Sequence, residues 1–208
     1  MMGEQTRMIG IYDYTVILTY GNAMFSIIGM YLAINNQLMG AIICLALSGI
    51  CDMFDGMVAN LKQRTKSEKR YGIQIDSLAD LISFGVFPSV LGYAVGLKHI
   101  SYLPLFIFYI LAALIRLAYY NVTEEEREES DSGKREYYEG LPVTSNAALI
   151  PFIFFLCVNY RVSFSLVYPF ILLLTGLLFI SHIKIKKVSP KKLAVGLFIV
   201  IIFVVTVH

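Results

Sequence analysis

The stretch "LMGAIICLALSGICDMFDGMVANL", residues 38–61, determines how the rest of the chain is interpreted. Its length and apolar first half are typical of a helix that crosses a bilayer, which takes roughly 17–25 residues. Asp52 and Asp55 lie in its second half, although a carboxylate inside a membrane is costly and usually serves a function. The stretch therefore predicts a membrane helix that carries part of a functional site.

The composition of the whole chain agrees with a membrane protein. Of its 208 residues 57% are hydrophobic and the mean hydropathy is +0.68, above what soluble globular chains show. Cys44, Cys51 and Cys157 lie in apolar stretches at no metal-ligand spacing, so we interpret them as small buried residues. The first residues lack the pattern of a signal peptide, and we expect the mature protein to start near Met1.

Apolar stretches recur along the chain and predict an all-α integral membrane protein. Six of them predict a core bundle of transmembrane helices, and a short seventh predicts a C-terminal span. They cover residues 16–34, 38–61, 73–97, 102–121, 143–160, 162–182 and 193–207. We divide the chain into three parts. Residues 1–15 form an N-terminal cytoplasmic or interfacial segment, residues 16–183 form the membrane domain, and residues 184–208 form a basic loop with a C-terminal apolar helix.

The distribution of positive charge supports this order of spans. With the N-terminus in the cytoplasm, 15 of the 17 Lys and Arg residues fall in cytoplasmic segments, and only Lys98 and Arg161 lie on the other side. The positive-inside rule expects such an asymmetry. We therefore predict a multi-pass protein of the cell membrane. The charged segment 123–140 is interpreted as a solvated cytoplasmic loop or helix extension.

The spacing of four aspartates predicts that they converge. Two sets of residues each recur at helical spacing on one face: Asp52, Asp55, Gly56 and Ala59, and then Gly72, Asp76 and Asp80. Both sets lie near the cytoplasmic ends of consecutive antiparallel spans, so the four carboxylates can meet in one cavity that opens to the cytoplasm. Carboxylate oxygens suit hard divalent cations, and we predict a pair of them, magnesium or manganese. The interleaved small residues leave room for a phosphate group or a neighbouring helix.

This pattern resembles the signature of the CDP-alcohol phosphotransferase family, D-x2-D-G-x2-A-R followed by G-x3-D-x3-D. The internal spacings agree, and two features depart from it. Asn60 stands where the family has Arg, and the spacer before Gly72, residues 61–71, is longer than in the family. Lys62 and Arg64 are candidates to supply the missing cation near the nucleotide phosphates.

Three further stretches resemble the phosphatidylserine synthase branch of that family. They are "QIDSLADLISFGVFPS" at 74–89, "RLAYYNV" at 116–122 and "EGLPVTSNAA" at 139–148. Tyr119 replaces an Arg of the second motif, and the third lacks its second Pro. The resemblance implies transfer of a phosphatidyl-type group from a CDP-linked lipid, CDP-diacylglycerol or an ether analogue, to the hydroxyl of L-serine, with release of CMP. It also implies a homodimer, and no nucleic-acid partner is expected.

The resemblance implies roles for individual residues. The metal ligands would be Asp52, Asp55, Asp76 and Asp80, with Asp80 also the general base on the serine hydroxyl. The nucleotide and the CDP-lipid would contact Gly56, Ala59, Asn22, Gly72, Arg64 and Lys62. Because serine is a zwitterion, its pocket needs a cation, for which Arg116 is the best candidate. Other candidates for that pocket are Ser83 and Asn121, with Glu139 and Thr144 after them.

Two alternatives stay open at this point. The same reaction could use glycerol 3-phosphate, inositol phosphate or inositol as acceptor, although Tyr119 in place of an Arg argues against a phosphorylated one. The acidic cluster could instead be a divalent-cation transport path. Transporters more often show inverted repeats or broken helices at the midplane, and the carboxylates here lie near one membrane face.

Overall fold

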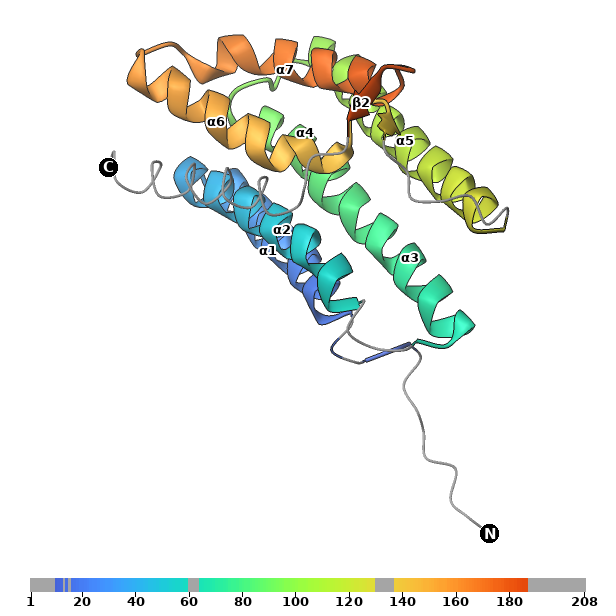
Figure 1. The fold of residues 1–208 in the computed structure, drawn as a ribbon. Helices are drawn as coiled ribbons and strands as arrows, with labels where there is room; N and C mark the ends of the chain where they lie inside the picture. Colours follow the sequence, from blue (N-terminus) through green and yellow to red (C-terminus); the bar gives the residue numbers. More distant parts are fainter. Residues whose placement is uncertain (1–9, 13, 15, 60–63, 130–136, 187–208) are drawn as a thin grey trace.

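The computed structural model describes residues 10–12, 14, 16–59, 64–129 and 137–186. Its architecture is helical, with one short pair of strands (Figure 1). The main helices are α1 (Ile17–Ile34), α2 (Leu38–Ala59), α3 (Lys66–Asp80), α4 (Phe87–Ala94), α5 (Leu103–Glu129), α6 (Asn146–Asn159) and α7 (Phe164–Phe179). A π-helical segment η1 (Leu81–Val86) joins α3 to α4, and single 3-10 turns are η2 (Ile100–Tyr102) and η3 (Val143–Ser145). The antiparallel strands are β1 (Tyr137–Glu139) and β2 (Lys184–Lys186).

Four helical stretches in the described part are long and apolar enough to cross a membrane. They are Ile17–Ile34, Leu38–Gly56, Lys66–Ala94 and Ile100–Arg127. They correspond to the first four predicted spans, and their length and composition agree with a multi-pass helical membrane protein. The fifth and sixth predicted spans are apolar helices of 14 and 16 residues, shorter than the roughly 17–25 residues of a typical span. The seventh predicted span, 193–207, lies outside the described residues.

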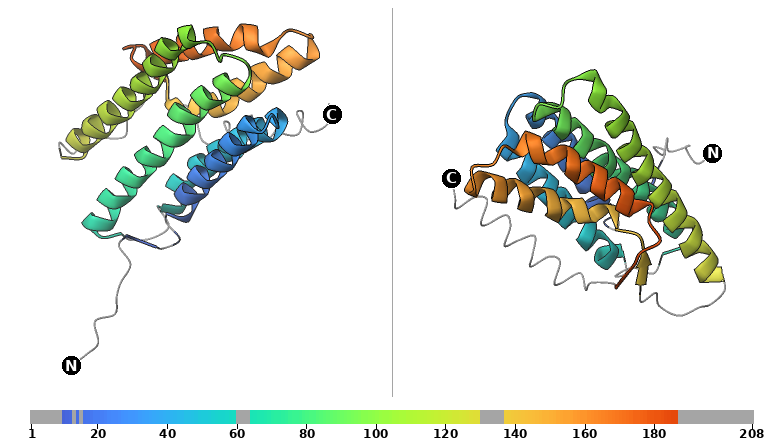
Figure 2. Two further views of the ribbon diagram at one scale, coloured as in Figure 1. Left: turned by 180° about the vertical axis from the view of Figure 1, so that it is seen from behind. Right: turned by 90° about the horizontal axis from the view of Figure 1, so that it is seen from above.

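Helices α1 and α2 form an antiparallel pair, and α3 runs between that pair and α5 (Figures 1 and 2). The turn from α1 to α2 is short because Asn36 adopts a left-handed conformation (φ 61°), which Asn tolerates better than most residues. Helix α6 packs on α2, and α7 packs on α4 and α5. The parts of α2 and α3 that carry the aspartates are thereby brought together beside α5.

A stripe of small and polar side chains lets α1 approach its neighbours closely. The buried residues of α1 are Thr19, Asn22, Ser26, Gly29 and Ala33. Gly29 lies at the tightest point, since a Cβ there would be 2.4 Å from Cζ of Phe87 and 2.9 Å from Cβ of Cys44. Small residues are typical of such contacts between membrane helices.

The π-helical segment follows directly after Asp80 and has an identifiable cause. Pro88 has no N–H to donate to the preceding turn. The carbonyl of Phe84, four residues earlier, instead accepts a hydrogen bond from the Tyr109 hydroxyl of α5 at 2.7 Å. The Tyr168 hydroxyl of α7 donates to the Pro88 carbonyl at 2.8 Å. Tyr109 thus stabilises the π-helical backbone, and Tyr168 stabilises the first turn of α4 that follows it. Segments of this π-helical kind are often found at functional sites.

Gly140 attaches the segment before α6 to the end of α7. Its N–H donates to the Ile183 carbonyl and the Leu141 N–H to the Leu178 carbonyl, both at 2.9 Å. Gly140 has a φ of +74°, and a Cβ there would be 2.8 Å from the Phe179 carbonyl oxygen, so this position requires glycine. The contact holds the following loop against the site described below.

We predict that Gly29→Ala destabilises the protein by about 1–3 kcal/mol, because the added methyl group overpacks the contact with Phe87. The midpoint of thermal unfolding in detergent micelles measures this. Gly21→Ala is the matched control on the same helix, since its Cβ would make an ordinary contact 3.5 Å from Sγ of Cys51. Equal midpoints for the two variants would contradict the close packing of α1.

Candidate active site

Helices α2 and α3 bring the four aspartates to one place. One carboxylate oxygen each of Asp52, Asp76 and Asp80 lies within 4.8 Å of the others. Asp55 lies beside Asp76. Asp55 and Asp80 are both buried. The convergence predicted from helical spacing is therefore present in the structure.

These residues fit a divalent cation. The cluster offers oxygen ligands only, the donor type that magnesium and manganese prefer. Oδ1 of Asp76 is buried, and among the described residues it has no hydrogen-bond partner. Carboxylates this close repel one another in a medium of low dielectric unless a cation or protons join them. The cluster can hold a metal ion.

Helix α1 supports one aspartate of each neighbouring helix. Oγ1 of Thr19 donates to Oδ2 of Asp55 at 3.2 Å, and Nδ2 of Asn22 donates to Oδ1 of Asp80 at 3.1 Å. Both bonds are buried, so they fix the two carboxyl groups in orientation. Asn22 was predicted from the sequence and Thr19 was missed. The signal for Thr19 is its position three residues before Asn22, on the same helical face.

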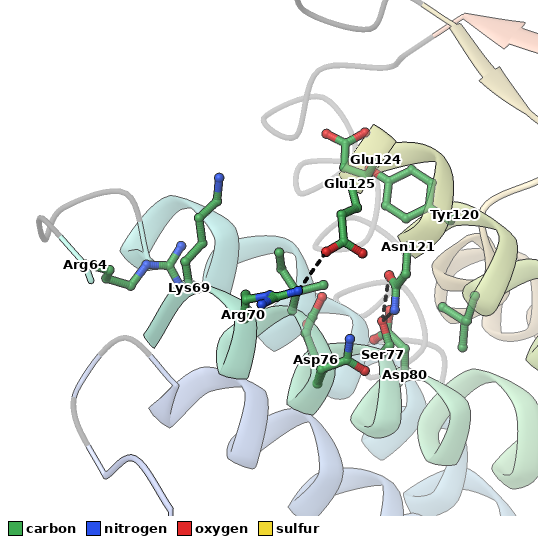
Figure 3. Close-up of a pocket in the computed structure, with 13 residues that line it drawn as sticks. Arg64, Lys69, Arg70, Asp76, Ser77, Asp80, Tyr120, Asn121, Glu124 and Glu125 are labelled. Atoms are coloured by element: carbon green, nitrogen blue, oxygen red, sulfur yellow. Dashed lines mark hydrogen bonds and ion pairs between the residues drawn. The ribbon is translucent and has the colours of Figure 1, made fainter. Parts of the chain in front are cut away.

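Three cavities meet at the aspartates, and Asp76 lines all of them. Each cavity takes its name from a residue that lines that cavity and neither of the other two. The Asn121 cavity, ≈ 390 Å³, lies between α3 and α5 (Figure 3). The Thr19 cavity, ≈ 170 Å³, lies among α1, α2 and α3. The Arg116 cavity, ≈ 320 Å³, is bounded by α5 and the loop before α6. The acidic cluster is thus accessible from several sides.

The Thr19 cavity gathers three of the predicted nucleotide residues, Gly56, Gly72 and Arg64. Asn22, predicted with them, is fully buried and lines none of the three cavities, because its amide packs against Asp80 instead. Gly56 faces open space, since a Cβ there would meet nothing within 4 Å. The Arg64 guanidinium lies against Gly72, whose Cβ would be 2.9 Å from Nη1. Arg64 therefore places a positive charge next to the cluster. The side chain of Ala59, and all of Asn60 and Lys62, lie outside the described part of the chain.

The Arg116 cavity brings a buried positive charge to the aspartates. Among the described residues that line it, Arg116 alone is cationic, and its side chain is buried. Its Cζ lies 5.3 Å from the centre of the Tyr120 ring, within the range of a cation–π contact. Tyr120 also lines the cavity and was missed, although it follows Arg116 by about one helical turn. Thr144 lines the opposite wall.

The Asn121 cavity has a charged mouth. Nδ2 of Asn121 donates to Oγ of Ser77 at 2.8 Å, which joins α5 to α3 (Figure 3). Arg70 and Glu125 form an exposed ion pair at 3.1 Å across the opening. An exposed pair of this kind contributes little to stability.

Two predicted acceptor residues lie apart from these cavities. Ser83 is fully buried in η1 and lines none of the three. Glu139 is also absent from their linings and accepts a hydrogen bond from the Tyr119 hydroxyl at 2.7 Å. That bond joins α5 to β1, next to Gly140. Glu139 thus anchors, through Tyr119, the start of the segment whose Thr144 lines the Arg116 cavity.

Comparison with known proteins gives a consistent result. Residues 15–179 match the family model described as CDP-alcohol phosphatidyltransferase. A CDP-diacylglycerol–serine O-phosphatidyltransferase of Saccharomyces cerevisiae is 41% identical over 106 residues, covering 50% of this chain and 37% of that protein. One of Helicobacter pylori is 28% identical over 92% of this chain and 79% of its own length. An archaetidylserine synthase of Methanothermobacter thermautotrophicus is 32% identical over 83% of this chain and 69% of its own length. The chain therefore belongs to the CDP-alcohol phosphatidyltransferase family of enzymes.

Proposed function

We propose that the protein transfers a phosphatidyl-type group from a CDP-linked lipid to the hydroxyl of L-serine and releases CMP, in phospholipid biosynthesis. The observation that carries this proposal is the convergence of four aspartates in a cavity that the buried Arg116 also lines. Serine as acceptor is supported by the names of the similar proteins, which are serine O-phosphatidyltransferases or an archaetidylserine synthase. The lipid of this chain is CDP-diacylglycerol or an ether analogue.

Asp52, Asp55, Asp76 and Asp80 would hold two divalent cations, Mg²⁺ or Mn²⁺. When bound, such a pair neutralises the pyrophosphate and stabilises the departing CMP. The support for this proposal is the oxygen-only donor set, the mutual approach within 4.8 Å of three of these carboxylates and the unpaired Asp76 oxygen among the described residues.

The nucleotide would bind in the Thr19 cavity. The open space at Gly56 leaves room for the cytidine and its phosphate against α2. Arg64, lying over Gly72, supplies positive charge for the phosphates and takes the part of the family Arg that Asn60 replaces. Lys62 is a second candidate for that charge, and Ala59 would complete the contact with the nucleotide.

Asp80 would act as general base on the serine hydroxyl. The hydrogen bond from Asn22 holds its carboxyl group in place, so that the other oxygen can accept the proton. A positioned base typically accelerates such a step by about 10²–10⁴-fold. The oxygen of serine then attacks the β-phosphorus of the CDP-lipid, and CMP leaves with the electrons of the broken P–O bond.

Serine would bind in the Arg116 cavity, with its carboxylate on the guanidinium of Arg116 and its ammonium toward the acidic cluster. The planar fork of Arg matches a carboxylate bidentately. Thr144 lines the same cavity and would contribute a further polar contact. Asn121 lines the neighbouring cavity and bonds to Ser77, so it is not part of this serine pocket. Tyr119 bonds to Glu139, so the acceptor side has a neutral hydroxyl where the family motif has a second Arg. This favours serine over glycerol 3-phosphate or inositol phosphate.

We further propose that the protein lies in the cell membrane with its N-terminus and its active site toward the cytoplasm. The asymmetric distribution of Lys and Arg supports this orientation. The membrane domain would cover residues 16–183, and family analogy favours a homodimer.

The acceptor assay tests the proposal directly. We expect the purified protein in CDP-diacylglycerol micelles to release CMP when serine and Mg²⁺ or Mn²⁺ are present. Chelation by EDTA should stop the release, and added metal should restore it. Release stimulated by glycerol 3-phosphate, inositol phosphate or inositol, but not by serine, would contradict the acceptor assignment. Divalent-ion flux into proteoliposomes without CMP release would favour a transporter.

We expect Arg116→Gln to raise the KM for serine about 10–100-fold, because it removes a charge-assisted contact of about 1.5–3 kcal/mol. The KM for the CDP-lipid should stay near that of the unchanged protein. Arg127→Gln is the matched control, since Arg127 lies on the same helix and pairs with Glu124. Equal increases in both KM values would contradict a serine-specific role for Arg116.

A further inference from the structure

Two contacts fix the register between α1 and the continuous helix of α3, η1 and α4. Asn22 donates to Asp80 at 3.1 Å, and Gly29 packs on the ring of Phe87. On each side the two contact residues are separated by about two helical turns. Between these two contacts, residues 23–28 of α1 therefore lie opposite residues 81–86, which form η1.

Ser26 and Ser83 lie in these opposing segments. Ser26 follows Asn22 at the i+4 position and Ser83 follows Asp80 at i+3, so each shares the face of its contact residue. Both serines and Asn22 are fully buried, at 0% exposure. The register and the burial together direct the two hydroxyl groups into the same interface.

Three polar side-chain atoms at this interface have no hydrogen-bond partner in the described part of the chain. Among the residues that the structure describes, Oγ of Ser26, Oγ of Ser83 and Oδ1 of Asn22 make no hydrogen bond. Buried polar groups in folded proteins are nearly always satisfied by protein or by ordered water. Two hydroxyls that donate or accept, and one amide oxygen that accepts, match the two to four partners of a buried water.

We propose that an ordered water molecule is bound between α1 and η1 by Ser26, Ser83 and Oδ1 of Asn22. By donating to Oδ1, this water sets the orientation of the Asn22 amide, so that its NH₂ group faces Asp80. A flipped amide would direct its oxygen at the carboxylate and lose the bond that holds it. Ser26 and Ser83 are thus positioning residues that act on Asp80 through Asn22. The water site is independent of the proposed function, whereas its effect on turnover depends on that function.

This assignment also separates Ser83 from substrate binding. Ser83 lines none of the three cavities around the aspartates. A serine substrate bound in any of these cavities therefore cannot reach the hydroxyl of Ser83. Ser83 instead lies buried in η1, the segment that contacts α1.

An experimental structure of the full chain, at a resolution that shows ordered water, tests the site itself. We expect a water peak within hydrogen-bonding distance, about 2.6–3.2 Å, of Oγ of both Ser26 and Ser83. A direct bond between the two hydroxyls, or an interface without water, would overturn the proposal.

Kinetics test the positioning role. We expect Ser26→Ala and Ser83→Ala each to lower kcat about tenfold, the loss that a single hydrogen bond to a positioning group can produce. The KM values for serine and CDP-lipid should not change. The double variant should be no slower than either single one, because both changes remove the same water. Ser89→Ala is the matched control, since its buried hydroxyl also lacks a partner among the described residues but lies nearly two turns beyond Ser83.

Two outcomes would overturn that role: unchanged kcat in both single variants, or an equal loss of kcat in Ser89→Ala. Serine-dependent CMP release by the unchanged protein reports on the proposed function separately. A missing water with normal release rejects only the water site, and an ordered water without release rejects only the function.

Discussion

The electrostatic cost of four carboxylates inside a membrane protein is the constraint on which the rest of the structure depends. Asp52, Asp55, Asp76 and Asp80 come from two helices, α2 and α3, and line one cavity. Oxygens of three of them lie within 4.8 Å of one another, where like charges repel strongly. Such a cluster is stable only with cations or protons among its oxygens, and the proposed two-metal site would provide that stabilisation together with a chemical use.

Much of the surrounding structure serves to hold these carboxylates in place. Thr19 and Asn22 of α1 each donate to one aspartate, and the small residues of α1 allow that helix to approach closely. Tyr109 bonds to the π-helical segment after Asp80, and Tyr168 bonds to the start of α4 that follows it. Gly140 fixes the loop that closes the cavity containing Arg116. Each support uses a hydrogen bond or a close contact that a larger or apolar side chain would remove.

The sequence was sufficient for the parts that depend on local periodicity. The first four spans follow from apolar length, and the convergence of the aspartates follows from their spacing on consecutive helices. Long-range contacts were not predictable in this way. The β1–β2 pairing joins segments that α6 and α7 separate in the sequence, and the π-helical segment depends on a hydroxyl from another helix. Thr19 and Tyr120 were missed because a single hydroxyl or aromatic ring in an apolar helix is usually a packing residue.

Joint binding of a pair of metal ions by α2 and α3 is central to the proposed chemistry. Anomalous diffraction from crystals of the protein grown with Mn²⁺ measures this most directly. We predict two manganese peaks roughly 3.5–4 Å apart, in contact with carboxylates from both helices. The absence of manganese from the cluster, or a single ion bound by one helix alone, would contradict it.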